Sequence, residues 1–237
     1  MSGHSHFKTI KYKKGAADAK RGNLFSKMAR EIIIAAKEGG SDVNFNPKLR
    51  MSIERAKEFN MPKENIERAV KKGTGELEGV KLESVVFEAY GPGGVAVIIE
   101  GITDNKNRAL GEIKKILTQN NGKLVGGGGV QWMFERKGVI IISSENKEEA
   151  ELAAIESGAD DLYWHNSSLD IYTKPEDLEK IRKSLEDKGM KPESVSLDLV
   201  AKEKVEINDK DKNACQKLFE ALDENEAVQE IYSNFKD

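Results

Sequence analysis

The chain has 237 residues, of which 33% are charged and 38% hydrophobic, and its formal net charge is −3. The longest uninterrupted apolar runs, residues 32–36 and 95–99, are five residues long, far below the roughly 20 that span a bilayer. A single cysteine, Cys215, excludes an internal disulfide and favours a reducing compartment. We therefore expect a globular, cytoplasmic protein with no membrane partner.

Positive charge is concentrated in the N-terminal third. Residues 1–73 carry 17 Lys and Arg against 8 Asp and Glu, whereas residues 74–237 carry 21 against 33. An acidic protein with such a basic end is expected to meet a polyanion through that end. Gly73 and Gly75, on either side of Thr74, mark the boundary between the two parts.

Three short amphipathic helices are predicted within the basic part. Residues 23–37 place their apolar side chains on one helical face and are followed by two glycines that suit a left-handed cap. Asn46 and Pro47 are typical of a helix start, and the second helix is expected to reach about residue 59. A third helix is expected over residues 62–73. Together they would form a small basic bundle.

The segment 7–14 has a different character, because it lacks apolar periodicity and interleaves two aromatic residues with four lysines. Lysines neutralise phosphates, and aromatic rings stack on bases without a sequence preference. The alternative is a solvated tail whose charge only keeps the protein soluble. We predict a nucleic-acid site in the N-terminal region, formed by Phe7, Lys8, Lys11, Tyr12, Lys13, Lys14, Lys20, Arg21, Lys27 and Arg30.

The basic part contains two long stretches, GHSHFKTIKYKKGAADAKRGNLFSKMAREI and NPKLRMSIERAKEFNMPKENIERAVKKGTGE. They resemble the opening of the YebC/PmpR family, which includes the mitochondrial translational activator of cytochrome c oxidase. Three further family-like motifs follow in the family's order, namely FEAYGPGG, VQWMFERKG and AVQEIYSNF. The resemblance implies a basic helical domain followed by two α/β domains. It also implies a regulator of gene expression, since some members are described as DNA-binding transcriptional regulators and others as ribosome-associated translation factors.

The chain departs from the family pattern at two places. Phe7 stands where the family commonly has Trp, which retains an aromatic ring for stacking. The glycine run at residues 126–129 is richer than usual, and its role stays open.

The acidic part has the pattern of strands alternating with helices. Strands are expected at 85–90 and 95–102 around the turn sequence GPGG, followed by a helix from 104 or 105 to 121 and a strand at 130–134. A compact unit of order β-α-β-β-α-β follows, and this order is typical of a ferredoxin-like unit. Its expected elements are strand 138–144, helix 146–157, strands 161–165 and 168–173, helix 175–187 and strand 193–200.

A final helix at 209–222 and a strand at 227–234 would complete the set that begins at residue 85. The expected fold class is therefore α+β with three domains, the ferredoxin-like unit being inserted into the middle one. The expected boundaries are residues 1–76 for the basic domain, 77–137 plus 205–237 for the discontinuous middle domain, and 138–204 for the insertion.

Enzymatic sites are not indicated. The glycine-rich stretches lack the following helix that a phosphate loop needs, and His4 and His6 lack further ligands for a metal. Asp161 and His165 share one face of a predicted strand, but nothing completes a nucleophile, base and orienting group. Cys215 is expected in a helix core, and the acidic residues 223–227 in a solvated loop. We predict no catalytic residue, cofactor, metal or small-molecule substrate.

The sequence thus predicts a non-enzymatic regulator of gene expression. A transcriptional regulator that binds DNA and a ribosome-associated translation factor that binds ribosomal RNA through the same surface are both open. A protein-interaction adaptor that uses its acidic domains is a third reading. Composition does not decide among these partners, and no residue pair indicates a base code.

Overall fold

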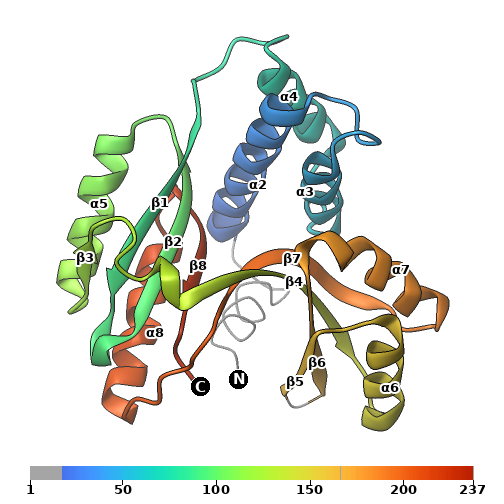
Figure 1. Ribbon diagram of the computed structural model, residues 1–237. Helices are drawn as coiled ribbons and strands as arrows, with labels where there is room; N and C mark the ends of the chain where they lie inside the picture. Colours follow the sequence, from blue (N-terminus) through green and yellow to red (C-terminus); the bar gives the residue numbers. More distant parts are fainter. Residues whose placement is uncertain (1–17, 166, 237) are drawn as a thin grey trace. The chain divides into compact units, whose positions relative to one another are not determined.

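The computed structural model describes residues 18–165 and 167–236, with side chains described from residue 22 onward. The chain mixes helices with two antiparallel sheets, which confirms the predicted α+β class (Figure 1). The described residues divide into two compact units, the first containing 18–129 and 208–231 and the second 130–165, 167–207 and 232–236. The division into three domains stays a prediction.

Three helices form the N-terminal part of the first unit (Figure 1). They are α2 (Asp18–Gly39), α3 (Pro47–Glu58) and α4 (Lys63–Thr74). Their apolar faces enclose one core, and the fully or nearly buried residues in it are Met28, Ile32, Ala35, Ala36, Leu49, Ala56, Met61, Ile66 and Ala69. The core confirms the three predicted amphipathic helices.

Asn46 joins the end of α2 to the start of α3. Its Oδ1 accepts a hydrogen bond from the backbone N–H of Leu49 at 3.0 Å, as predicted for the helix cap. Its Nδ2 donates to the carbonyl oxygens of Ala35 and Gly40, each at 2.8 Å. Asn46 is 4% exposed, and its bonds to Leu49 and Ala35 are buried, so they satisfy polar groups that water does not reach.

The expected end of the third helix at Gly73 is wrong. Helix α4 continues through Gly73 and Thr74, and Gly75 caps it with a φ of 83°. Gly73 is needed for packing instead, because a Cβ atom there would lie 2.5 Å from the carbonyl oxygen of Ile33 and 2.7 Å from the Cβ of Ala36. The glycine therefore allows α4 to approach the backbone of α2.

The first unit also contains a four-stranded sheet of order β3-β1-β2-β8. Its strands are β1 (Glu83–Tyr90), β2 (Ala96–Thr103), β3 (Lys123–Val125) and β8 (Val228–Ser233), and its helices are α5 (Lys106–Gln119) and α8 (Asp209–Asp223). The buried faces of the helices carry Ala109, Ile113 and Leu117 from α5 and Cys215, Leu218 and Leu222 from α8. Helices α5 and α8, although far apart in the chain, contact each other.

The second unit has the expected element order β-α-β-β-α-β. Its elements are β4 (Phe134–Ser143), α6 (Lys147–Ser157), β5 (Asp161–His165), β6 (Ser168–Thr173), the short η3 (Pro175–Asp177), α7 (Leu178–Asp187) and β7 (Pro192–Ala201). The strands pair antiparallel in the order β5-β6-β4-β7. Gly138 allows α7 to pack closely against the sheet, since a Cβ atom there would clash with the side chains of Thr173 and Leu178.

Two strand predictions differ from the structure. The segment predicted as a strand at 130–134 forms a single 3-10 turn, η2 (Gln131–Met133), and β4 begins only at Phe134 and runs unbroken to Ser143. The short strand β3 was not predicted, because three residues are too few for an alternation pattern to appear.

Candidate nucleic-acid interface

The structure separates the ten residues predicted to bind nucleic acid into three groups. The six residues of the segment 7–14, namely Phe7, Lys8, Lys11, Tyr12, Lys13 and Lys14, lie outside the described residues. Lys20 and Arg21 belong to the first turns of α2, where only the backbone is described. Lys27 and Arg30 are described fully, and both are turned towards acidic residues of the first unit.

Lys27 is buried beside the loop that follows α8. Its ammonium group donates to the backbone carbonyl oxygen of Asp223 and lies 2.9 Å from the Oδ1 of the same residue. The Lys27 side chain is 6% exposed and that of Asp223 27%. In this arrangement a phosphate would have to replace the carboxylate, so phosphate contact by Lys27 stays a prediction that requires the pair to open.

Arg30 binds the same loop one helical turn further along α2. Its guanidinium donates to the carbonyl oxygen of Glu226 at 2.8 Å and to that of Ile102 at 3.2 Å. It also lies 3.1 Å from the Glu226 carboxylate, which is 76% exposed. The acidic residues 223–227, predicted as a solvated loop, therefore include two carboxylates that neutralise cations of α2.

Most of the other cations of the helical part are also bound within the first unit. Arg55 lies 2.9 Å from Glu230 and 3.5 Å from Glu31. Lys37 donates to the carbonyl oxygen of Leu82 at 3.0 Å. Fewer cations are thus available to a partner than the sequence count indicates, because a paired cation contributes less positive potential to the solvent.

Four cations of α3 and α4 have no hydrogen bond or ion pair to any residue that the structure describes: Lys57, Arg68, Lys71 and Lys72. All four are exposed. Three of them, Arg68, Lys71 and Lys72, belong to α4 and lie between its middle and its C-terminal end. This stretch of α4 is consequently the part of the described helical bundle where most of the unpaired positive charge is available to a partner.

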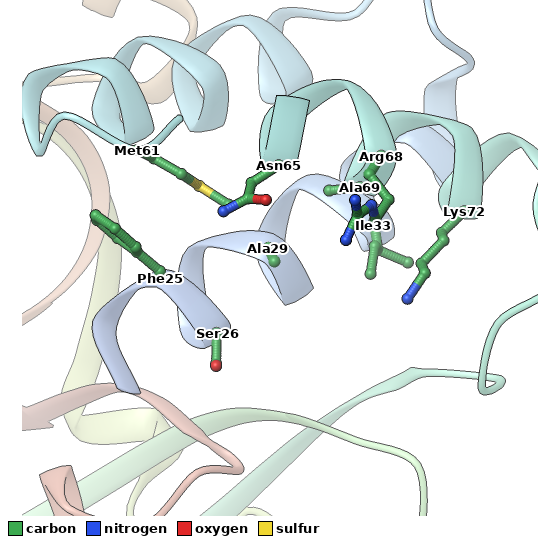
Figure 2. A pocket seen from close by; sticks show the side chains of 9 residues that line it. All are labelled: Phe25, Ser26, Ala29, Ile33, Met61, Asn65, Arg68, Ala69 and Lys72. Carbon is green, nitrogen blue, oxygen red and sulfur yellow. The ribbon is translucent and has the colours of Figure 1, made fainter. Parts of the chain in front are cut away.

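Arg68 and Lys72 line a groove between α2 and α4 (Figure 2). The groove has a volume of about 200 Å³. Figure 2 shows Arg68, Lys72 and Asn65 projecting from α4, with Phe25 at the opposite end of the groove from Lys72. The sequence signal for this set is the spacing of 65, 68 and 72, which places three polar side chains on one helical face.

An exposed aromatic residue lies on the loop between α2 and α3. Phe45 is 86% exposed, although the backbone of its loop is held by hydrogen bonds from Phe45 and Asn46 to the carbonyl oxygen of Asp42. Asp42 Oδ1 also accepts from the N–H of Asn44 at 2.8 Å. An aromatic ring presented on a fixed loop beside basic helices is suited to stacking on a base. Phe45 was not among the predicted residues; its position between two basic helices was the available signal.

The glycine-rich stretches form turns, as expected. Gly93 and Gly94 have positive φ within the short η1 (Pro92–Gly94) that connects β1 to β2. In the run at 126–129, Gly128 has a φ of 83°, and its N–H donates to Glu88 Oε1 at 2.6 Å. A helix start of the kind that holds phosphates follows neither loop within the described chain.

The two side chains that could take part in catalysis, His165 and Cys215, are buried in the protein interior. His165 Nε2 lies 2.8 Å from Asp170 Oδ2, and the two side chains are 8% and 1% exposed. Cys215 is fully buried, and burial together with the nearby Asp211 raises the pKa of its thiol to about 11. A thiol held neutral in this way is a poor nucleophile at physiological pH. Within the described residues no three His, Cys, Asp or Glu side chains come together as metal ligands.

A helix that crosses a membrane must be both long and apolar. Among the described residues, no helix meets both conditions for crossing one.

The molecule is thus of a recognisable class: an α+β protein in which a cationic helical part accompanies two antiparallel sheets. Two family models match the chain, the "TACO1/YebC protein N-terminal domain" over residues 5–76 and the "TACO1/YebC second and third domain" over residues 82–235. The chain belongs to the TACO1/YebC family, which confirms the resemblance found in the sequence.

Similar proteins match along almost their whole length. A protein of Halothermothrix orenii is 48% identical over 99% of this chain and 95% of its own. One of Geobacter sulfurreducens is 46% identical over 99% of this chain and 96% of its own. Both are named probable transcriptional regulatory proteins. The crystal structure of the conserved hypothetical protein Aq1575 from Aquifex aeolicus is 44% identical, covers 98% of this chain and 96% of its own, and superposes with a TM-score of 0.89.

Proposed function

We propose that this chain is a non-enzymatic regulator of gene expression that binds nucleic acid through its basic N-terminal part. One observation carries the proposal for the described residues: Arg68, Lys71 and Lys72 of α4 remain exposed and without a partner there, while most other cations of the helical bundle are paired. Unpaired cations on one helix give a local positive potential that attracts phosphates. The predicted residues 7–14 would contribute further cations from the same N-terminal part of the sequence.

Transcriptional regulation through DNA is the first form of the proposal. Its support is the name of the relatives, which are 46–48% identical over nearly the full chain and are called probable transcriptional regulatory proteins. In this form the phosphate contacts position the protein on the duplex, and no residue is assigned to a base edge.

A translation factor that binds ribosomal RNA through the same surface is the second form. It is supported by the exposed Phe45 and by the narrow groove beside Arg68, because single aromatic rings and small pockets suit unstacked bases better than a duplex. The cytoplasm is the expected location for either form.

We also propose that the chain forms three domains, which comprise residues 1–76, residues 77–137 with 205–237, and residues 138–204. This division is supported by the element order between β4 and β7 and by the sheet that strands on both sides of that segment share. The acidic domains would repel phosphate and orient the molecule on its partner.

The test compares ribosome co-sedimentation with duplex-DNA mobility shifts at matched ionic strength. In the full chain, Lys8, Lys11, Lys13 and Lys14 are replaced by Gln, and the matched control replaces Lys174, Lys180, Lys183 and Lys191 of the second unit. If all four N-terminal lysines contact phosphate, the slope of log affinity against log salt falls in magnitude by about 3. An unchanged slope, or an equal change in the control, would refute the nucleic-acid site.

The same experiment separates the two forms. Tight binding to one promoter over unrelated DNA supports transcription. Ribosome binding with weak, sequence-independent DNA shifts supports translation. Binding to neither partner at low salt contradicts the proposed function as a whole.

A further inference from the structure

The groove between α2 and α4 combines the two kinds of side chain that a nucleotide requires. Its walls carry cations at one end and an aromatic ring at the other, with a small apolar floor between them (Figure 2). All its residues belong to the first unit. They are Phe25, Ser26, Ala29, Ile33, Met61, Asn65, Arg68, Ala69 and Lys72.

The cationic end is formed by Arg68 and Lys72. They are four residues apart on α4, so their Cβ atoms lie on one face, about 5–6 Å apart. Neither side chain has a hydrogen bond or ion pair to another residue in the described parts of the chain. An arginine fork and a lysine ammonium next to each other are suited to a single phosphate, which accepts several charge-assisted hydrogen bonds.

The other end is apolar and partly open. Phe25 is half-buried against the bundle core, whereas Met61 and Ala69 are buried at 6% and 3% exposure. The flat ring of Phe25 and the thioether of Met61 give a surface against which a base can stack. Asn65 lies between the two ends, and its side-chain amide makes no hydrogen bond within the described chain.

Size decides how much of a ligand the groove can take. Its volume of about 200 Å³ is below the roughly 300–1,000 Å³ that enclose drug-sized ligands. A base pair is too large for a space of this size. One base with its adjoining phosphate is the unit that matches both the volume and the distribution of charge.

We propose that this groove binds one unpaired nucleotide of an RNA, with its phosphate between Arg68 and Lys72 and its base against Phe25. Asn65 favours RNA over DNA, because its amide offers both a donor and an acceptor to a ribose 2′-hydroxyl, the group that distinguishes RNA from DNA. Unpaired bases in bulges and loops are also the usual targets of specific RNA recognition. The proposal rests on the proposed function and deepens it.

The test uses the full chain and three hairpins of one sequence: an RNA with a single-nucleotide bulge, the same RNA without the bulge, and the bulged DNA. The bulged base is 2-aminopurine, whose fluorescence changes on stacking. We expect the bulged RNA to bind about tenfold more tightly than either other hairpin. The double variant R68Q/K72Q should remove that preference and lower the magnitude of the salt slope by about 1.4.

The matched control is K57Q/K81Q, which removes the same charge from two exposed cations outside the groove. It should retain the preference for the bulge. N65A should reduce the ratio of RNA to DNA affinity while leaving the salt slope unchanged, because it removes no charge. Thermal melting of every variant shows that the bundle remains folded, as expected for exposed side chains.

Several results would overturn the groove proposal and leave the proposed function intact. These are equal binding of bulged and unbulged RNA, an equal loss in the two double variants, or bulged DNA binding as tightly as bulged RNA. Absence of binding to all three hairpins, to duplex DNA and to ribosomes would instead contradict the proposed function itself. Preference for an acidic peptide over all nucleic acids would assign the groove to a protein partner and overturn the proposal.

Discussion

Replacement of Lys27 by Met tests whether this residue belongs to the interior of the first unit or to its binding surface. Methionine keeps much of the length and apolar character of the lysine stem, so the main change is the loss of the ammonium group. That group serves both the carboxylate and the backbone carbonyl oxygen of Asp223. Both acceptors lose the hydrogen bond to this ammonium group in the variant.

The expected cost follows from how deeply the pair is buried. Removing one partner of a fully buried ion pair costs about 3–5 kcal/mol. Here Lys27 is 6% exposed but Asp223 is 27% exposed and regains water when its partner is lost. We therefore expect the free energy of opening α2 to fall by about 2 kcal/mol, which corresponds to roughly 30-fold faster exchange of its protected amides.

Hydrogen exchange measured by mass spectrometry on peptides of α2 is the suitable assay. Both tryptophans, Trp132 and Trp164, belong to the second unit, so intrinsic fluorescence follows a different part of the chain. A double-mutant cycle with D223A isolates the pair, and a coupling of about 1 kcal/mol is expected. D223A alone should cost less than K27M, because Lys27 retains the backbone carbonyl as an acceptor.

Two results would refute this reasoning. One is unchanged exchange of α2 in K27M, and the other is a coupling near zero. Nucleic-acid binding provides an independent check: the salt slope should stay the same in K27M, whereas a lysine in contact with phosphate would lower its magnitude by about 0.7–0.9.

Four further predictions concern single residues. N46A should lower the free energy of unfolding of the helical part by about 2–3 kcal/mol, because the helix cap and the hydrogen bonds to the buried Ala35 carbonyl and the partly buried Gly40 carbonyl are lost; helical circular dichroism in urea measures it. G73A should lower it by about 1–3 kcal/mol despite the better helix propensity of alanine, since the added methyl group meets the Ile33 carbonyl oxygen; a rise in melting temperature would contradict the close approach. Cys215 should react with iodoacetamide at pH 8 about 100-fold more slowly than in urea, because a thiol pKa near 11 leaves little thiolate. Because folding raises this pKa, the contribution of the neutral thiol to the free energy of unfolding is present below pH 9 and is lost as the pH rises through 11. F45A should weaken binding to single-stranded oligonucleotides by about 1–3 kcal/mol in a fluorescence titration while leaving the melting temperature unchanged, as the ring is 86% exposed.

Local chemistry allowed much of the fold to be predicted. Asn46 followed by Pro47 indicated the start of α3, and apolar periodicity located α5, α6, α7 and α8 within a few residues. The predicted helix end at Gly73 was wrong, because a glycine that caps a helix and one that lets another helix pack closely look the same in sequence. Their difference depends on what lies opposite, which here is the backbone of Ile33.

The candidate site shows the same limit more clearly. A count of cations indicated a basic surface, but it could not show that Lys27 and Arg30 meet Asp223 and Glu226, almost 200 residues away in the chain. Nor could it distinguish these from Arg68 and Lys72, which remain without a partner in the described structure. Pairing between distant residues is decided by the tertiary fold, and it determines which charges a partner encounters.

The close approach at Gly73 has a consequence for affinity. The glycine fixes α4 against the carbonyl of Ile33, and Ile33 itself lines the groove that ends at Lys72. The two walls of the groove are therefore held at a set separation before any ligand arrives. Such preorganisation lowers the entropy lost on association, so a small number of contacts can contribute a larger share of their energy to binding.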